Sequence, residues 1–456
     1  MSSAVDGLVS GLSTTSMINQ LISAEAAPQT RLKSKVTTAQ TAVASYQSVN
    51  SRVSALKTAS DAVSQLSTWR GVKATSTSTS VSATAIAGAT NSAAGTTTFD
   101  VAQLAKSQIS AGKVPVTGPA TAATTFDITI APLDGSSPGT TKTITLGDDK
   151  SAAGLAEAIN AAGIGVKAAV VTTGGSENIL QLSGTKTGAA NAFKLSGLDV
   201  ALTNHAEASN AKLNIGGGED LGGYTVTSET NTFSKLMPGV SLTVSKLETG
   251  VTVSAAQDVS GIADKFQAMV DAANAALTEI SSQTAYNAAT KKGSPLTGDF
   301  AVRNMSQQIL SGISQGLSWD NPNYDSNVAE DPTTNPKKLS ASFAKLGIQL
   351  DSTGKLQFDS AKFTAAYNAD PDAIKKAGIA AGDKFEALTT TMTQNISSVI
   401  TGRNNEIDQL TTQIENWDIR LASKRLSLQK TYSDLEVSLG KLKEQSNWLA
   451  GQLAGL

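Results

Sequence analysis

The strongest constraint on the fold of this chain is a run of apolar residues near its C-terminal end. Every seventh residue there is apolar without a miss, at Ile407, Ile414, Leu421, Leu428, Leu435, Leu442 and Leu449. Leu410 and Trp417 fill the second core position of the first two heptads, and further on a neighbouring stripe of Tyr432, Leu439 and Leu453 takes over. A strict seven-residue repeat predicts a helix that supercoils against a partner helix. One amphipathic helix lying on its own domain is the alternative.

A second helical pattern, from Arg31 to Leu66, supplies a partner. Its candidate core positions are Tyr46, Val49, Val53 and Leu56. Pro28 fits either the first turn of a helix or a break between a short helix, Met17–Ala26, and the longer one. Because neither terminal helix has a partner nearby in the sequence, we expect the two ends of the chain to pair with each other and to share these core residues.

The middle of the chain, from Lys73 to about Val253, alternates apolar and polar residues between Gly and Asp turns, as strands do. We expect strands at 126–130, 142–146, 179–184, 224–228, 240–247 and 251–255. The Ser/Thr/Ala tract 73–88 is either a linker or a strand, and the β pattern that resumes at Phe99 and Val101 favours a strand. In 151–193, Ser151 is expected to cap a helix that Gly163 ends, before a hairpin turning at Gly174–Gly175.

Helical periodicity resumes at Ile262, and a further helix is expected around Phe300–Ile313. Residues 346–359 have the pattern of a hairpin, and Trp319–Lys338 has the composition of a loop. The whole pattern predicts a multi-domain α+β fold in which outer segments enclose inner ones. The expected parts are a terminal coiled coil (1–45 and 405–456), a helix-rich domain (46–72 and 257–404), a β-rich head (73–108 and 209–256) and an inserted outer head domain (109–208).

The composition argues against catalysis and against nucleic acid. Lys and Arg number 36 and Asp and Glu 38, so a net charge of −2 gives no electrostatic basis for binding nucleic acid or an anionic membrane. There is no cysteine, and the single histidine, His205, cannot form a zinc site alone. The glycine-rich stretch 215–223 lacks the lysine of a phosphate loop, and 351–355 lacks the acidic spacing of a calcium loop. We expect no enzyme activity, no cofactor and no metal.

Targeting signals are also missing from the sequence. The first residues lack a cationic region followed by a long apolar core, so a cleaved secretion signal is not expected. No stretch reaches the roughly 18 apolar residues of a membrane span. The protein therefore either stays in the cytoplasm or leaves by another export route.

Several motifs resemble the flagellar filament-capping family, that of hook-associated protein 2 (the FliD family). At the N-terminal end the matching residues are Gly7, Leu8, Ser10, Gly11, Leu12, Thr14, Glu25, Pro28, Tyr46 and Leu56. Similar segments follow in the family's order at 99–110, 231–244, 294–305 and 346–363, and in the final helix at Trp417, Arg420 and Leu421. Segment 151–193 is similar to the flagellin-type Ile-Asn repeat through Ile159, Asn160, Gly163, Ile164, Gly188 and Phe193. The loop 319–338 does not align with the family.

This resemblance implies a non-enzymatic cap at the tip of the filament. The β domains would form a plate, the helical segments would form legs, and the copies would form a homo-oligomeric ring of about five subunits. The implied partners are flagellin, the hook–filament junction proteins and a flagellar export chaperone, with export by the flagellar type III apparatus. Flagellin itself, a junction protein, a surface adhesin and a secreted hydrolase are the alternatives. The N-terminal region lacks flagellin's Leu-Ser-Ser-Gly and Asp-Asp-Ala-Ala-Gly signatures.

Overall fold

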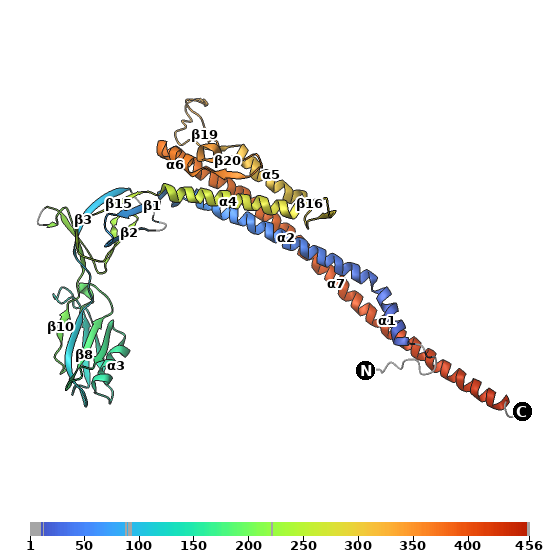
Figure 1. The fold of residues 1–456 in the computed structure, drawn as a ribbon, viewed down its shortest axis with the longest axis horizontal. Coiled ribbons are helices and arrows are strands. Elements are labelled where there is room, and N and C mark those ends of the chain that lie inside the picture. The colour runs from blue at the N-terminus through green and yellow to red at the C-terminus, as the bar shows by residue number, and fades with distance from the viewer. Residues whose placement is uncertain (1–10, 12, 87–88, 90–93, 220–221, 454–456) are drawn as a thin grey trace. The chain divides into compact units, whose positions relative to one another are not determined.

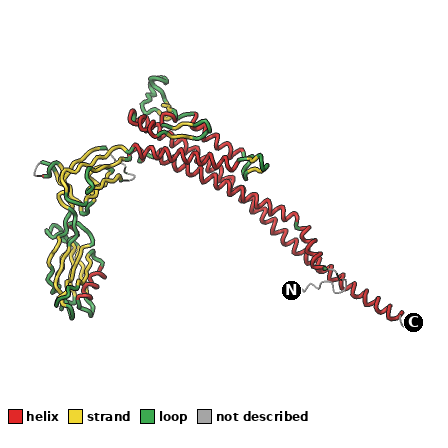
Figure 2. The backbone as a smooth tube through the Cα atoms, in the orientation of Figure 1, coloured by secondary structure: helices red, strands yellow, loops and turns green. Residues whose placement is uncertain are grey.

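The computed structural model describes residues 11, 13–86, 89, 94–219 and 222–453 (Figure 1). The chain divides into two compact units. One comprises Met1–Ser64 and Ala263–Leu456, and the other comprises Gln65–Ile262. The first is mainly helical and the second mainly β, as the secondary-structure colouring in Figure 2 shows. This arrangement confirms the predicted multi-domain α+β fold, with the two ends of the chain in one unit.

The helical unit is built on two long antiparallel helices, α2 (Ala27–Ser64) and α7 (Pro371–Leu453). The shorter α1 (Thr14–Glu25) precedes α2, and α4 (Val259–Thr284), α5 (Phe300–Ser314) and α6 (Ser360–Ala369) complete the unit. Pro28 lies in the first turn of α2, directly after the break between α1 and α2, so both predicted roles of this residue are confirmed. At 83 residues, α7 begins well before the heptad repeat.

Two groups of packed aromatic rings contribute to the core of the helical unit. Phe266 of α4 lies 5.1 Å from Phe363 of α6 and 5.9 Å from Phe358, measured between ring centroids. Phe343 and Phe385 pack edge to face at 5.8 Å. These separations are those at which aromatic pairs add to the free energy of burial. They fasten α4 and α6 together and hold Phe385 of α7 in the same unit.

Helices α2 and α7 approach closely where α7 has a glycine. A Cβ atom on Gly382 would lie 2.6 Å from the carbonyl oxygen of Ser60 and 2.6 Å from the backbone nitrogen of Ser64. Both are backbone atoms, which cannot rotate aside. Gly382 therefore costs helix propensity and in return allows close contact between the two helices.

Three small hairpins decorate the helices. They are β16–β17 (Tyr286–Asn287 and Lys292–Gly293), β18–β19 (Leu317–Asp320 and Lys338–Ala341) and β20–β21 (Ile348–Leu350 and Leu356–Phe358). The last confirms the hairpin expected at 346–359. The loop expected at Trp319–Lys338 differs, because its two ends pair as strands with Trp319 opposite Leu339. Within the remaining loop, the buried Asn335 side chain donates to the carbonyl oxygens of Asp325 and Val328, which fixes the loop's path.

The β unit has two layers of sheet around its first core. A five-stranded sheet has the order β1-β15-β3-β11-β12 and a three-stranded sheet the order β13-β14-β2. Their strands are β1 (Val72–Ser76), β2 (Val81–Ala85), β3 (Gly95–Gln103), β11 (Ala211–Ile215), β12 (Tyr224–Ser228), β13 (Thr232–Met237), β14 (Val240–Val244) and β15 (Glu248–Gln257). Tract 73–88 is thus two strands in two different sheets, where the sequence predicted one; residues 87–88 lie outside the described residues.

The segment between β3 and β11 forms a second core. Its sheets have the orders β10-β4-β8-β7 and β6-β5-β9. The strands are β4 (Ile109–Pro115), β5 (Thr125–Ile130), β6 (Thr140–Thr145), β7 (Val166–Val171), β8 (Glu177–Gly184), β9 (Phe193–Ser196) and β10 (Thr203–Ala206), and one helix, α3 (Ala152–Ala162), packs on them.

The Ile-Asn segment has the structure that the sequence predicted. The Ser151 hydroxyl accepts a hydrogen bond from the Gly154 N–H at 3.2 Å, and Gly163 ends α3 in the left-handed conformation with φ 63°. Ile159 is fully buried. The Asn160 amide donates to the Ala168 carbonyl at 2.8 Å and accepts from the Ala168 N–H at 3.0 Å, so it satisfies both backbone groups of one residue in β7.

The chain enters and leaves this second core side by side. Lys106 and Ser209 form an isolated antiparallel bridge, with mutual backbone hydrogen bonds of 3.0 and 3.1 Å. At the same place Gly188 adopts φ 100°, and a Cβ there would lie 2.8 Å from Glu229. The buried Gln108 side chain bonds both backbone groups of Phe193 at 2.8 Å. The junction between the two cores of the β unit is therefore short and is held by polar contacts between particular residues.

One prediction compares two of the glycines of α7, Gly382 and Gly402. Gly382→Ala should lower the free energy of unfolding, because a clash with the α2 backbone, costing about 1–3 kcal/mol, outweighs the gain in helix propensity. Gly402→Ala should instead raise it by about 0.5–1 kcal/mol, since nothing lies within 4 Å of a Cβ there. Denaturant unfolding followed by helical circular dichroism measures both. Equal effects of the two substitutions would contradict the close contact.

A second prediction concerns the segment 109–208. Since Lys106 and Ser209 are bridged, a Gly/Ser linker of a few residues should replace the segment and leave the five-stranded sheet folded. The shortened chain should unfold cooperatively and keep its β circular dichroism. A matched deletion of 126–196, which cuts through the second core, should aggregate. Aggregation of several versions of the first deletion would show that the two cores fold only together.

Candidate assembly interface

The chemical motifs considered in the sequence have structural explanations. Among the described residues, no three His, Cys, Asp or Glu side chains gather where they could hold a metal ion. His205 is exposed on β10. In the β20–β21 turn, hydrogen bonds from the Thr353 hydroxyl and the Lys355 N–H lower the pKa of Asp351 to about 2. That carboxylate closes a hairpin turn. These motifs therefore provide no candidate site, and the candidate that remains is the surface of the terminal helices.

The terminal helices form a small apolar core of their own. Ile18 and Ile22 of α1 and Leu421 of α7 are buried together, and partly buried side chains surround them: Ala26, Trp417, Leu428 and Tyr432. The Arg420 guanidinium lies 4.9 Å from the centre of the Trp417 ring, a distance at which a cation–π contact is favourable. Pairing of the N- and C-terminal helices, part of the predicted fold, is thereby confirmed.

Polar contacts set the register of this pairing. The Gln29 amide, which is only 5% exposed, donates to the Ile414 carbonyl at 3.3 Å and to the Asp418 carboxylate at 2.5 Å. Arg425 donates to the Asn19 side chain at 2.8 Å. Buried polar residues inside an apolar seam fix register, because a slipped pairing leaves them without partners.

The same register shows where along α7 the contact with α1 ends. Asn19 lies opposite Arg425, and α1 begins five residues before Asn19, at Thr14. In an antiparallel pair, α1 therefore reaches to about residue 430 of α7. The described residues provide no helix to cover α7 beyond that point.

The heptad residues divide accordingly. Leu410 and Leu421 are buried, at 9% and 8% exposure. A second group is half-buried, namely Ile407, Ile414, Trp417 and Leu428. A third group is exposed, at 44%, 60% and 56%, and consists of Leu435, Leu442 and Leu449. The structure thus brings together the first part of the predicted interface and leaves the last three leucines on the surface of this chain.

The four N-terminal interface candidates lie in a different layer. All are buried, but Tyr46, Val49, Val53 and Leu56 lie farther along α2, in the helical bundle. The Tyr46 hydroxyl donates to the Asp299 carboxylate, and the Ser48 hydroxyl donates to Glu279 of α4 at 2.6 Å. The structure therefore places these four residues beside α4, α5 and the first half of α7, because antiparallel pairing opposes them to residues before the heptads.

The residues of α1 that cover the heptads were not among the predicted interface residues. Ile18 and Ile22 lie four positions apart within the helix expected at Met17–Ala26. That spacing is the signal for one helix face. It is too short to reveal its partner, since two apolar residues on one turn fit many surfaces.

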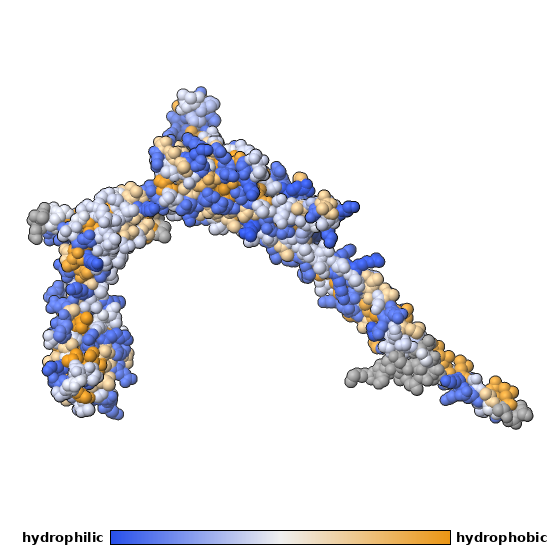
Figure 3. All heavy atoms as spheres, in the orientation of Figure 1, coloured by the Kyte–Doolittle hydropathy of each residue, from blue (hydrophilic) through white to orange (hydrophobic). Residues whose placement is uncertain are grey.

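Exposed apolar side chains are concentrated at this end of the helical unit. Ten of the 22 large hydrophobic residues exposed among the described residues lie in α1 and after residue 404 of α7. They are Met17, Leu21, Ile419, Leu426, Leu435, Val437, Leu442, Trp448, Leu449 and Leu453. Figure 3 shows orange, hydrophobic surface toward the C-terminal end of α7. Exposed apolar side chains gathered at one end of a unit in this way mark an interaction site.

Comparison with known protein families identifies the family to which the chain is similar. A family model for the C-terminus of flagellar hook-associated protein 2 matches residues 208–447, and one for the N-terminus matches residues 10–108. The chain belongs to the flagellar hook-associated protein 2 family. Of the N-terminal motif that resembles this family, residues Gly7, Leu8, Ser10 and Leu12 lie outside the described residues.

Individual members of the family align along most of the chain. Flagellar hook-associated protein 2 of Escherichia coli strain K12 is 24% identical over 484 positions, covering 98% of this chain and 97% of the relative. That of Salmonella typhimurium strain LT2 is 25% identical over 336 positions, 68% of each chain. The crystal structure of the D1-D2-D3 domains of the Escherichia coli flagellar cap protein FliD covers 80% of this chain and 99% of that one, with a TM-score of 0.57 and 24% identity. This likeness supports the fold described above.

Among the described residues, no helix is both long enough and apolar enough to cross a membrane. The exposed apolar residues of α1 and α7 occupy helices that also carry charge, as in the Lys430–Asp434 ion pair at 2.9 Å. Such helices suit contact with other protein helices.

A third prediction concerns Tyr46. Burial, reinforced by the hydrogen bond to Asp299, raises the pKa of Tyr46 from its ordinary value of 10.0 to about 12. The unfolded chain therefore loses this proton first as the pH rises, so the stabilising contribution of Tyr46 is complete below pH 10 and is lost between 10 and about 12. Tyr46→Phe should be less stable than the parent at neutral pH and should lose less stability above pH 10. Free energies of unfolding measured at neutral pH and above pH 10 test this, and the substitution of the exposed Tyr286 by Phe is the control. A difference in unfolding free energy between Tyr46→Phe and the parent that does not change with pH would contradict it.

Proposed function

We propose that this protein caps the distal end of the bacterial flagellar filament, where it promotes folding and insertion of flagellin and prevents loss of exported subunits. Membership of the hook-associated protein 2 family is the main support. A role of this kind needs self-assembly and helical contacts, and it needs no catalytic site. The observation that carries it within the structure is the exposed apolar end of the paired terminal helices.

In this proposal the four predicted parts of the chain have separate tasks. The coiled coil 1–45 with 405–456 and the helical part 46–72 with 257–404 act as the leg, and the β parts 73–108 with 209–256 and 109–208 form the plate. Support comes from the division of the chain near residues 64 and 262 and from the two separate cores of the β unit. Folding of flagellin and its lattice contacts would supply the free energy of insertion, with no nucleotide.

The proposed partners follow from the same role. They are further copies of this chain in a ring of about five, flagellin, the hook–filament junction proteins and a flagellar export chaperone. The proposed location is the filament tip, reached through the flagellar type III apparatus. The apolar leg residues, Ile419 and Leu426 among them, face away from the α1 contact and are free to meet other helices.

A fourth prediction tests the leg. Leu421→Glu with Leu428→Glu places two carboxylates against Ile18 and Ile22. The buried Leu421 contributes about 1.5–3 kcal/mol and the half-buried Leu428 a part of that, and an unpaired buried charge costs several kcal/mol more. The terminal helices should separate, while the β unit, whose cores contain neither residue, stays folded. Cells that carry only this variant should release unpolymerised flagellin and should not swim.

The matched control is the pair Leu421→Ile and Leu428→Ile, which keeps volume and apolarity and should support swimming. Swimming and flagellin in the culture supernatant are measured for both variants in a strain without its own copy. Normal motility of the Glu variant would show that the α1–α7 contact is not needed for capping.

A further inference from the structure

The end of α7 beyond residue 430 carries a complete heptad pattern of its own. From Leu428 onward, core residues alternate at intervals of four and three: Leu428, Tyr432, Leu435, Leu439, Leu442, Ser446, Leu449 and Leu453. In heptad notation the d positions are all leucine, and the a positions are Tyr432, Leu439, Ser446 and Leu453. Parallel two-stranded coiled coils have leucine at d and β-branched residues at a, so the d positions here follow that pattern and the a positions do not.

This pattern is a continuation of an interface that already exists. Leu428 and Tyr432 pack against Ile18 and Ile22 of α1, and the same two stripes then run on past the reach of α1. Leu442 is 60% exposed and Leu453 is 66% exposed. The face that binds a helix within the chain is thus presented again, one turn later, to a helix from elsewhere.

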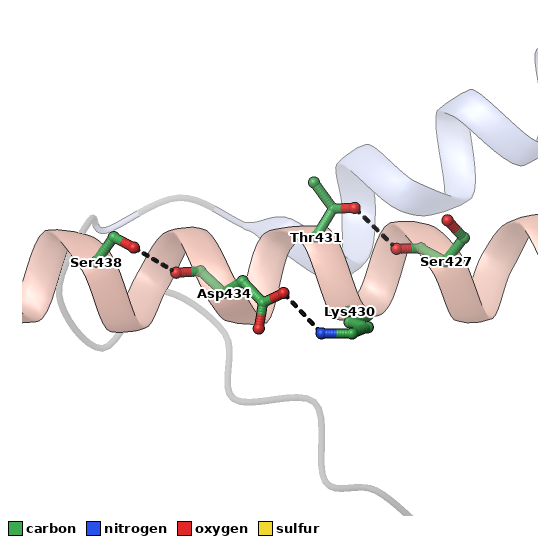
Figure 4. Close-up of polar contacts among 5 residues, drawn as sticks. All are labelled: Ser427, Lys430, Thr431, Asp434 and Ser438. Atoms are coloured by element: carbon green, nitrogen blue, oxygen red, sulfur yellow. Dashed lines mark hydrogen bonds and ion pairs between the residues drawn. The ribbon is translucent and has the colours of Figure 1, made fainter.

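The positions that flank the stripe are free of like-charge conflict. The g positions, which would face a neighbouring copy, are uncharged: Thr431, Ser438, Gln445 and Gln452. Figure 4 shows that the Thr431 hydroxyl donates to the Ser427 carbonyl at 3.0 Å and the Ser438 hydroxyl to the Asp434 carbonyl at 2.9 Å, both within α7. These hydroxyls therefore need no partner across an interface. The ion pair between Lys430 and Asp434 lies at the outer f and c positions.

We propose that residues Leu435–Leu453 of α7 form a parallel, in-register coiled coil with the same segment of a second copy of this chain. The polar residue Ser446 decides the orientation. In a parallel pair, Ser446 faces Ser446 of the other copy, so one polar layer is matched with itself. In an antiparallel pair centred on Leu439 and Leu442, Ser446 faces Leu435, which places a hydroxyl against an apolar side chain.

The inference rests on the proposed self-assembly of the cap and adds to it which helix joins the copies and in which direction. It applies to the protein before it seats on a filament. Pairing aligns the C-terminal ends of two copies and covers leucines that would otherwise face water. Seating would then exchange this contact for contacts with the filament.

The chain has no cysteine, so single cysteines report this pairing directly. The full-length variants Ser446→Cys and Leu442→Cys lie at core positions, and Glu444→Cys lies at an outer f position as the matched control. The purified proteins are treated with a mild oxidant, and disulfide-linked dimers are measured on a non-reducing gel. Facing core residues of a parallel pair lie within the Cα separation that a disulfide requires.

The expected result is that most of the Ser446→Cys and Leu442→Cys protein becomes dimer while Glu444→Cys stays monomeric. Adding Leu435→Glu and Leu449→Glu to Ser446→Cys should abolish the dimer. No dimer at position 446, or equal dimer at 444, overturns the proposal. A dimer that forms only when Ser446→Cys is mixed with Leu435→Cys overturns the parallel orientation. Swimming of cells that carry Ser446→Cys under reducing conditions tests the capping function separately.

Discussion

The antiparallel contact between α2 and α7 is the interaction on which the helical unit depends. It joins residues more than 300 positions apart, as the bond from Gln29 to Asp418 across 389 positions shows. Closing so long a loop is tolerable because its entropic cost grows only with the logarithm of its length. The contact is tight because Gly382 lets the backbones meet at Ser60 and Ser64. Once the ends are held in this way, a large β part can occupy the middle of the chain without weakening them.

Apolar seams alone would leave this contact free to slip by a turn or a heptad. The buried polar groups remove that freedom. Gln29 reaches two acceptors on α7, and Tyr46 reaches the Asp299 carboxylate, whose other oxygen caps α5 at the Val302 N–H. Each bond is satisfied in only one register, and a slipped alternative would leave a buried amide or hydroxyl without a partner. Stability here comes from apolar burial, and uniqueness comes from a few hydrogen bonds.

The apolar face of α7 changes phase near Leu421. Before it, the second core position lies three residues after the first, as in Leu410 and Trp417; after it, the interval is four, as in Tyr432 and Leu439. The face therefore turns around the helix, and α1, separated from α2 at Ala26, follows it. Beyond α1 the exposed residues of this face are Leu435, Leu442, Leu449 and Leu453. A protein that functions as a single chain would not keep such a surface, but an assembly component can.

The sequence by itself determined the elements and their order. The heptads of α7, most strands, the Ser151 cap and the Gly163 stop follow from local periodicity and turn chemistry, which act within a few residues. The pairing of the two ends follows because neither terminal helix has a partner nearby in the sequence. The separation of tract 73–88 into two sheets does not, because sheet membership depends on pairing partners 155–185 residues away.

How far the interface extends along α7 was likewise determined only by the tertiary structure. Leu421 and Leu442 occupy the same heptad position with the same residue, yet one is buried and the other exposed, since α1 begins at Thr14 and its register carries it only to about residue 430. In the sequence, Tyr46 and Leu56 were predicted to belong to the same apolar seam. In the structure they lie in another layer, because α4 and α5 bury them. Periodicity fixes which face of a helix is apolar, whereas only the folded chain fixes what covers that face.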